Sequence, residues 1–157
     1  MKTIGVISDT HGMLRTTVYN ALHGVDLIIH AGDVGSLEVL NVLREIAPVY
    51  AVRGNMDGGK LSVILAPTEV VDIKGILFYV LHDLGHLDLD PASAGFAGVI
   101  YGHTHKPARN EKNGVVYLNP GSAGPKRFKL PVTLARMTLS GFDRELEINT
   151  EFVDLEE

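Results

Sequence analysis

Residues 3–11 read TIGVISDTH, and this apolar run ends directly at Asp9 and His11. Two further runs, DLIIHAG and VYAVRG, end in the same way at Asp33 and Asn55. Apolar runs of this length predict strands that are buried on both faces of a sheet. The carboxyl ends of such strands are where α/β sheets collect ligands. The repetition therefore predicts a functional site along one edge of a sheet.

The second half of the chain carries the same pattern twice more. ILFYVL ends at a histidine, and GVIYG is followed by a His-Thr-His block. The seven candidate ligands are Asp9, His11, Asp33, Asn55, His82, His103 and His105. Four imidazoles, two carboxylates and one amide form a mixed nitrogen and oxygen set that suits two borderline divalent ions.

Each block taken alone also has an ordinary structural explanation. Ser-Asp-Thr-His-Gly is rich in turn formers, and Asp33 would suit a helix cap. Asn55 would suit a turn, and His82 could be a satisfied core residue. His86, four residues further on, is the rival of His82 as a ligand. Recurrence at five strand ends is what favours a metal site.

Spacing suggests how the candidates would be arranged. In the D-x-H and H-x-H blocks the ligands are two residues apart, so extended backbone would put both on one face. Two metals about 3.5–4 Å apart need a shared carboxylate, for which Asp33 is the natural candidate. Asp57 is expected to orient a ligand histidine through its free ring nitrogen. His30 lies within a buried strand, so it could only contact a ligand residue and not a metal ion.

The pattern of elements predicts an α/β fold. Strands are expected at residues 3–8, 26–30 and 49–52, with helices at 14–22 and 37–46, as a parallel βαβαβ unit with right-handed crossovers. Hairpins are expected for residues 70–73 with 76–81, 108–111 with 115–118, and 132–139 with 145–152, with a strand at 99–101 and a helix near 91–95. This order predicts two packed β-sheets flanked by helices.

Composition limits the classes of function. The 157 residues, 45% of them hydrophobic, are expected to form one domain over residues 1–157. A net charge of -5 argues against an extended nucleic-acid surface, and the absence of cysteine leaves His, Asp and Asn as ligands. Neither a signal peptide nor a membrane span is expected. The expected location is therefore the cytoplasm. Homo-oligomer formation is left open.

In this order, the blocks D-x-H, G-D, G-N, a strand-end His and G-H-x-H resemble the calcineurin-like metallophosphoesterase superfamily, over residues 3–124. The likeness is greatest to its small, capless phosphodiesterases of bacteria and archaea, whose pattern includes Asn-Pro-Gly-Ser. The resemblance implies a four-layer αββα sandwich and two divalent ions, manganese, nickel, iron or zinc. It assigns Asp9, His11 and His105 to the first metal, Asn55, His82 and His103 to the second, and Asp33 to the bridge.

Two departures from the family pattern stand out. The subgroup usually has His-Gly-His where this chain has His82-Asp83-Leu84-Gly85-His86, and His82 is preferred because it directly ends the strand. Larger phosphatases of the superfamily carry a leaving-group acid, a histidine, after the asparagine. Met56 stands there, so protonation of the leaving group has no obvious donor.

The resemblance also implies a mechanism in which a metal-bridging hydroxide attacks phosphorus in line. Two divalent ions, two carboxylates and one hydroxide leave a charge of about +1, which a phosphodiester monoanion neutralises. Arg15 and Arg53 lie near the ligand blocks and could help a monoester dianion bind. The leading hypothesis is a metal-dependent phosphodiesterase acting on small substrates. The alternatives are a phosphomonoesterase at the same site, and a non-catalytic interaction scaffold, as in a retromer subunit of this fold.

Overall fold

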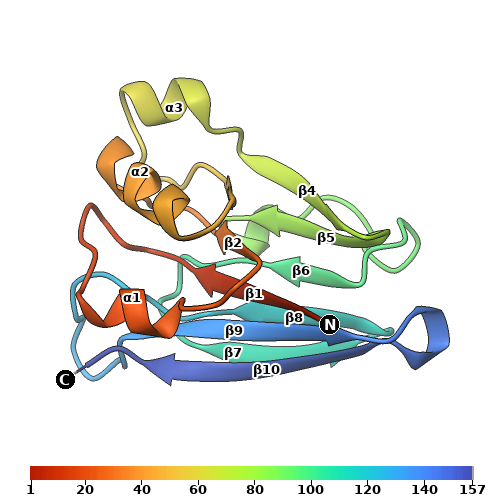
Figure 1. Cartoon of the computed structure of the whole chain (residues 1–157). Helices are drawn as coiled ribbons and strands as arrows, with labels where there is room; N and C mark the ends of the chain where they lie inside the picture. Colours follow the sequence, from red (N-terminus) through yellow and green to blue (C-terminus); the bar gives the residue numbers. More distant parts are fainter. Residues whose placement is uncertain (157) are drawn as a thin grey trace.

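The computed structural model describes residues 1–156 and contains two five-stranded sheets packed face to face (Figure 1). The first sheet has the order β10-β9-β1-β2-β3, formed by β1 (Lys2–Ile7), β2 (Leu27–His30), β3 (Val49–Ala51), β9 (Thr133–Ser140) and β10 (Glu147–Asp154). The second has the order β4-β5-β6-β8-β7, formed by β4 (Thr68–Ile73), β5 (Ile76–Leu81), β6 (Gly98–Ile100), β7 (Ala108–Lys112) and β8 (Val115–Asn119). The predicted two-sheet architecture is confirmed.

The first half of the chain forms the predicted parallel unit. β1 pairs with β2 and β2 with β3, all parallel. Between β2 and β3, α2 (Leu37–Ile46) has the predicted bounds and buries Val39, Leu40 and Leu43. It ends before Pro48, because the residue preceding a proline is disfavoured in helical backbone, and Ala47 is extended.

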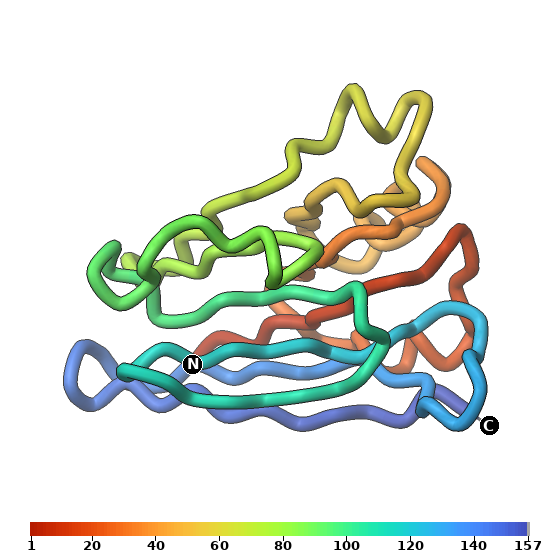
Figure 2. Tube along the Cα trace, turned by 180° about the vertical axis from the view of Figure 1, so that it is seen from behind, coloured from red at the N-terminus to blue at the C-terminus, as the bar shows by residue number. Residues whose placement is uncertain are grey.

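Helices cover the first sheet, whereas a loop segment covers the second. α1 (Thr17–Ala21) and α2 pack over the outer face of the first sheet, together with α3 (Lys60–Ile64). On the opposite face, seen from behind in Figure 2, residues 84–96 pack Leu84, Leu87 and Phe96 over the second sheet. This segment includes the 3-10 helix η1 (Leu84–His86). Between the sheets lies a core that contains Ile4, Ile29, Phe78, Ile100, Leu118 and Met137.

The three predicted hairpins are present. Lys74-Gly75 and Asn113-Gly114 have positive φ angles at both positions, as a two-residue hairpin turn requires. The third connection is longer than expected. It includes the 3-10 helix η2 (Asp143–Glu145), so β10 starts at Glu147 opposite Ser140 rather than at residue 145.

Helix predictions were less accurate than strand predictions. The helix expected at residues 14–22 is limited to α1, and residues 91–95 form only a turn, ended by Gly95 at φ 84°. α3 was not predicted, because the two glycines before it suggest a loop, yet its Leu61 and the following Leu65 are buried. None of the helices in residues 1–156 has the length and apolar character that crossing a bilayer requires.

The strand topology gathers the site loops at one end of the sandwich. β1, β2 and β3 run parallel to one another, as do β5, β6 and β8 in the other sheet. In Figures 1 and 2 the loops after β1 and β8 lie at the same end of the molecule. Parallel strands bring their carboxyl ends to one edge, so the residues that follow them can form one site.

Candidate metal centre

Five of the seven candidate ligands meet in a compact, largely buried cluster. Two groups have ligand atoms that all lie within 4.8 Å of one another: Asp9, His11 and His105, and Asp9, Asp33 and His82. The first group has the same members as the set expected for the first metal. Asn55 and His103 lie beside this cluster on its solvent side and are exposed.

Asp9 is completely buried and lies at the centre of the cluster. Its Oδ2 accepts hydrogen bonds from Ser8 Oγ (2.7 Å) and from the backbone N–H of His103 (3.1 Å). Its Oδ1 has no hydrogen-bond partner and lies 3.3 Å from His105 Nε2 and 3.7 Å from His82 Nε2. One oxygen is thus used to fix the side chain, and the other faces the histidines.

The two carboxylate oxygens of Asp33 also have different partners. Its Oδ1 accepts the backbone N–H of Met56 at 2.8 Å, and its Oδ2 lies 3.2 Å from His82 Nε2 and 3.8 Å from His11 Nε2. The helix-cap explanation is wrong, because the residue at the start of α2 is Ser36. Asp33 therefore contacts one histidine of each expected metal set.

His82 points into the cluster, whereas His86 does not. Nδ1 of His82 lies 2.8 Å from the carbonyl of Ala31, which can only accept, so Nδ1 carries a proton and Nε2 faces the carboxylates. The side chain of His86 is 83% exposed, and its Nε2 approaches only Asp83, at 3.9 Å. The geometry favours His82 at this position of the site.

The pKa values follow from this crowding of charge. Burial alone would raise the pKa of Asp9, but the close contact with His105, the hydrogen bond from Ser8 and the charge of His82 outweigh it and leave the pKa lowered. Burial likewise acts against the lowered pKa of Asp33 and the raised pKa of His82, and the contact between the two side chains outweighs it. The cluster therefore favours a positive charge between its carboxylates.

The open side of the cluster contains Asn55 and His103. His103 Nδ1 lies 3.2 Å from Asn55 Oδ1, and the ring of His103 stands edge-on to that of His82 with 5.2 Å between the ring centroids. The side chain of His103 is 43% exposed. The three residues expected at the second metal are therefore neighbours, but two of them face solvent.

Left-handed backbone, not extended backbone, aims most of these side chains. The residues with positive φ include Asp9 (57°), His11 (48°), Asp33 (54°), His103 (74°) and His105 (63°). The expectation that extended backbone would align ligands two residues apart is wrong. Non-glycine residues in this region are uncommon, and such strain concentrates at functional sites.

Asp57 holds two site loops together instead of orienting a histidine. Its carboxylate accepts backbone N–H groups of Val34 (3.1 Å), Gly35 (3.0 Å) and Gly54 (2.9 Å). The loop after β2 is thereby tied to the loop after β3. A side chain at Gly54 would collide with the backbone nitrogen and Oδ1 of Asp33, so this close approach requires glycine.

His30 supports the site from beneath. Its Nδ1 accepts the N–H of Gly32 (3.1 Å), so its Nε2 carries the proton that it donates to Thr10 Oγ1 (3.0 Å). Thr10 in turn donates to the carbonyl of Val34 (2.7 Å). Complete burial lowers the pKa of His30 to about 4, so the ring is neutral. This chain of bonds joins the loops after β1 and β2.

Sequence reasoning did not assign roles to Asn119 and Ser122, although the Asn-Pro-Gly-Ser phrase marked them. Asn119 Nδ2 donates to the carbonyl of Gly102 (3.1 Å) and to Thr104 Oγ1 (3.0 Å). Ser122 Oγ donates to the carbonyl of Asp9 (3.1 Å). Both side chains are buried; Asn119 holds the loop that carries His103 and His105, and Ser122 holds the loop that carries Asp9.

The donor set fits divalent metal ions. The buried side-chain atoms without a hydrogen-bond partner include Asp9 Oδ1, His11 Nε2, His82 Nε2 and His105 Nδ1. Buried polar atoms are normally satisfied, and four such donor and acceptor atoms in one cluster are what a metal-binding site requires. Imidazole and carboxylate donors suit zinc, iron, nickel and manganese.

Comparison with known proteins shows the family to which the chain belongs. Residues 1–141 match the calcineurin-like phosphoesterase superfamily domain. The probable metallophosphoesterase MJ0623 of Methanocaldococcus jannaschii is 39% identical over 132 residues, covering 76% of this chain and 67% of that protein. The phosphodiesterase YfcE of Escherichia coli is 30% identical over 141 residues, covering 73% and 76%. The chain therefore belongs to the calcineurin-like phosphoesterase superfamily.

Solved structures show the same architecture. One described as a novel archaeal phosphodiesterase has a TM-score of 0.75 and 26% identity, and covers 96% of this chain and 99% of that one. A zinc complex of Vps29 from Entamoeba histolytica has a TM-score of 0.73 at 24% identity, covering 98% and 99%. At that identity the second likeness concerns the fold alone.

Proposed function

We propose that this protein is a dinuclear metal-dependent phosphodiesterase. In this proposal Asp9, His11 and His105 hold one divalent ion, Asn55, His82 and His103 hold the other, and Asp33 bridges them. The observation that carries the proposal is the convergence of unpartnered donor atoms on the space between Asp9 Oδ1 and Asp33 Oδ2. Bound ions would supply Lewis acidity, which acidifies water and neutralises phosphate charge.

The protein's own groups would position the reactants. Two carboxylates in the cluster reduce its net positive charge, which favours a phosphodiester monoanion over a monoester dianion. Arg53 Nη1 donates to the carbonyl of Ser62 (2.8 Å) and Arg15 Nη2 to that of Gly124 (3.3 Å), so both guanidinium groups are anchored near the site. Met56, 67% exposed, offers no proton to a leaving group.

Two other functions would use the same fold. A phosphomonoesterase would need cationic help beyond the metals, and a scaffold would not need ligand residues at all. All seven ligand-type residues are present, and five of them converge. This convergence favours an enzyme over a scaffold.

We further propose that residues 1–157 form one domain, because one core packs between the two sheets.

The proposal is tested by removing metal and reconstituting with manganese, nickel, iron or zinc. Each form is assayed with an aryl phosphodiester and the matched aryl phosphomonoester at neutral to mildly alkaline pH. We expect metal-dependent turnover, faster for the diester. Alkyl diesters should be slower, since proton donation to a poor leaving group typically contributes about 10²–10⁴-fold. Faster monoester turnover with every metal would refute diester preference, and metal-independent activity would refute the mechanism.

A further inference from the structure

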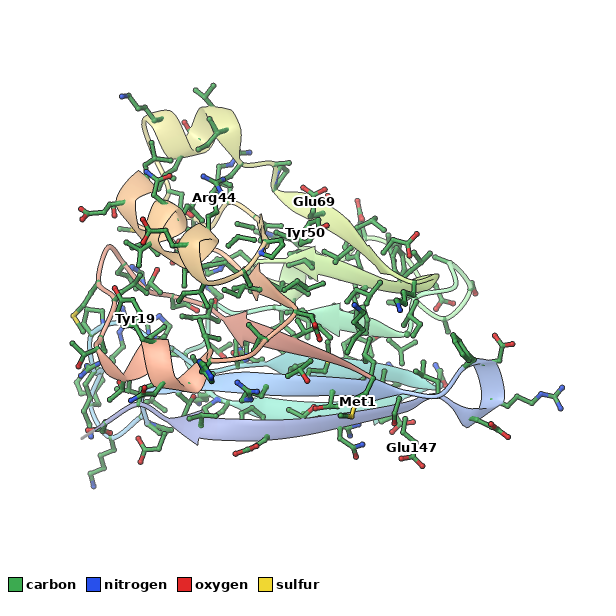
Figure 3. The ribbon with its side chains drawn as sticks, in the orientation of Figure 1. Met1, Tyr19, Arg44, Tyr50, Glu69 and Glu147 are labelled. Carbon is green, nitrogen blue, oxygen red and sulfur yellow. The ribbon has the colours of Figure 1, made fainter. Side chains whose placement is uncertain are left out.

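A pocket of about 220 Å³ opens beside the solvent-facing side of the metal centre. Its lining includes Asn55 and His82, both candidate ligands. The pocket is lined by the loop after β3, the start of β4 and the end of β5; β3 and β4, which Tyr50 and Glu69 mark in Figure 3, are edge strands of the two sheets. A phosphate bound at the metal centre would therefore carry its substituents to the mouth of this pocket.

Part of the pocket lining is apolar. Leu81 ends β5, is 2% exposed and pairs across the hairpin with Thr68, while Pro67 precedes β4. The volume exceeds the roughly 150 Å³ of an apolar cavity known to accept benzene. The pocket has room for one aromatic ring.

Charged groups in the pocket narrow the choice of ligand. The guanidinium of Arg53 is held by its bond to the Ser62 carbonyl, and the backbone N–H of Arg53 donates to the carbonyl of Ala66 (2.9 Å). A fixed planar guanidinium stacks well on an aromatic face. Asp83, whose side chain is 33% exposed, also lines the pocket and would repel an anionic substituent.

We propose that this pocket binds one ester group of the substrate and selects a neutral aromatic group, carbocyclic or heterocyclic. This proposal rests on the proposed phosphodiesterase function and names its substrate class. The ring packs against Pro67 and stacks on Arg53, while the phosphate stays at the metal centre. The pocket cannot be predicted from local sequence patterns, because its lining comes from segments of different sheets.

The test uses two diesters with the same leaving group, phenyl p-nitrophenyl phosphate and methyl p-nitrophenyl phosphate, on the metal-loaded protein. A well-placed apolar group commonly contributes about tenfold or more to selectivity, so we expect kcat/KM to favour the phenyl ester by about tenfold. Thr68→Trp should fill the pocket and bring this ratio close to one. Val70→Trp, on the same exposed face of β4 but outside the pocket lining, should keep the ratio.

A wild-type ratio close to one, or an unchanged ratio in Thr68→Trp, would overturn the pocket assignment and leave the proposed function standing. If neither ester is hydrolysed with any metal, the proposed function fails, and binding decides the pocket. Calorimetry would then compare diphenyl phosphate with dimethyl phosphate on the metal-loaded protein. Tighter binding of diphenyl phosphate that Thr68→Trp abolishes supports the pocket, whereas equal binding of the two overturns it.

Discussion

Six of the seven candidate ligands divide into a buried half and an open half, and the side chain of His11, 25% exposed, is intermediate. Asp9, Asp33, His82 and His105 are at most 5% exposed, and each has an oxygen or nitrogen directed at another member of the group. Asn55 and His103 are exposed and contact each other. The buried half is held by a polar network beneath it, whereas the open half borders solvent and the pocket.

The difference in burial gives the two halves different roles in binding metal and substrate. Buried donors that are fixed before a metal arrives need little reordering when it binds, so they favour tight and selective binding. Exposed donors lose more freedom on binding and are closer to the place where a substrate would enter. We therefore expect the two metal positions to differ in affinity, with the tighter position in the buried half.

The largest effect is expected at Asp33, the member of the buried half that is proposed to bridge both ions. Even residues that only support a metal ligand change affinity or activity by about 10–100-fold, so Asp33→Asn should lower kcat by more than about a hundredfold. Both ions should bind more weakly, and the fold should persist. Activity, metal content and thermal unfolding would be measured beside Asp88→Asn, an exposed control. Full activity in Asp33→Asn would contradict the bridging role.

A comparable loss is expected when His82, but not His86, is removed. His82→Ala should weaken the binding of one ion by about a hundredfold, because its Nε2 faces both carboxylates. His86→Ala should change neither ion, since that side chain lies in solvent. Metal titration by calorimetry gives both numbers. Loss of an ion in His86→Ala alone would reverse the assignment.

The buried half can also be tested through pH. The pKa of His30 is about 4 in the folded protein against an ordinary 6.5, so only the unfolded chain takes up a proton between these values. The stability contributed by neutral His30 is complete above pH 6.5 and is lost as pH falls towards 4.

Replacing His30 should remove this dependence. Between pH 6.5 and 5 the wild type should lose about 2 kcal/mol of unfolding free energy relative to His30→Asn, which keeps an acceptor but does not titrate. Urea unfolding at both pH values, with a chelator present, measures the difference. Parallel pH profiles for the two proteins would mean that His30 is not held neutral.

The smallest effect should distinguish two histidines of one block. His105 is 4% exposed and lies in the buried half, whereas the side chain of His103 is 43% exposed. His105→Ala should weaken the tighter ion about tenfold more than His103→Ala does. Calorimetric titration with manganese or zinc would separate the two ions. If His103→Ala weakens the tighter ion more, the ranking of the two halves is wrong.

Much of the fold could be predicted because it depends on local patterns. Apolar runs located the strands, Lys74-Gly75 and Asn113-Gly114 predicted two hairpins, and Ser36 with Pro48 bounded α2. Elements whose patterns are short or broken were predicted less well. α3 depends on burying Leu61 and Leu65 against distant residues. In residues 91–95 the spacing of the backbone hydrogen bonds changes, from Ala94 N–H to Asp90 and from Gly95 N–H to Ala92, so the segment forms a turn.

The sequence by itself determined which residue types stand at the ends of the strands, and so the chemistry of the candidate site. Only the tertiary structure decided how they converge. Asp9 and His82 are 73 positions apart in the numbering, yet Asp9 Oδ1 and His82 Nε2 lie 3.7 Å apart, because two sheets present their strand ends at one edge. The three N–H groups on Asp57 and the pocket beside Asn55 and His82 also arise between segments. Local propensity acts over a few residues, whereas these contacts exist only once the two sheets have packed.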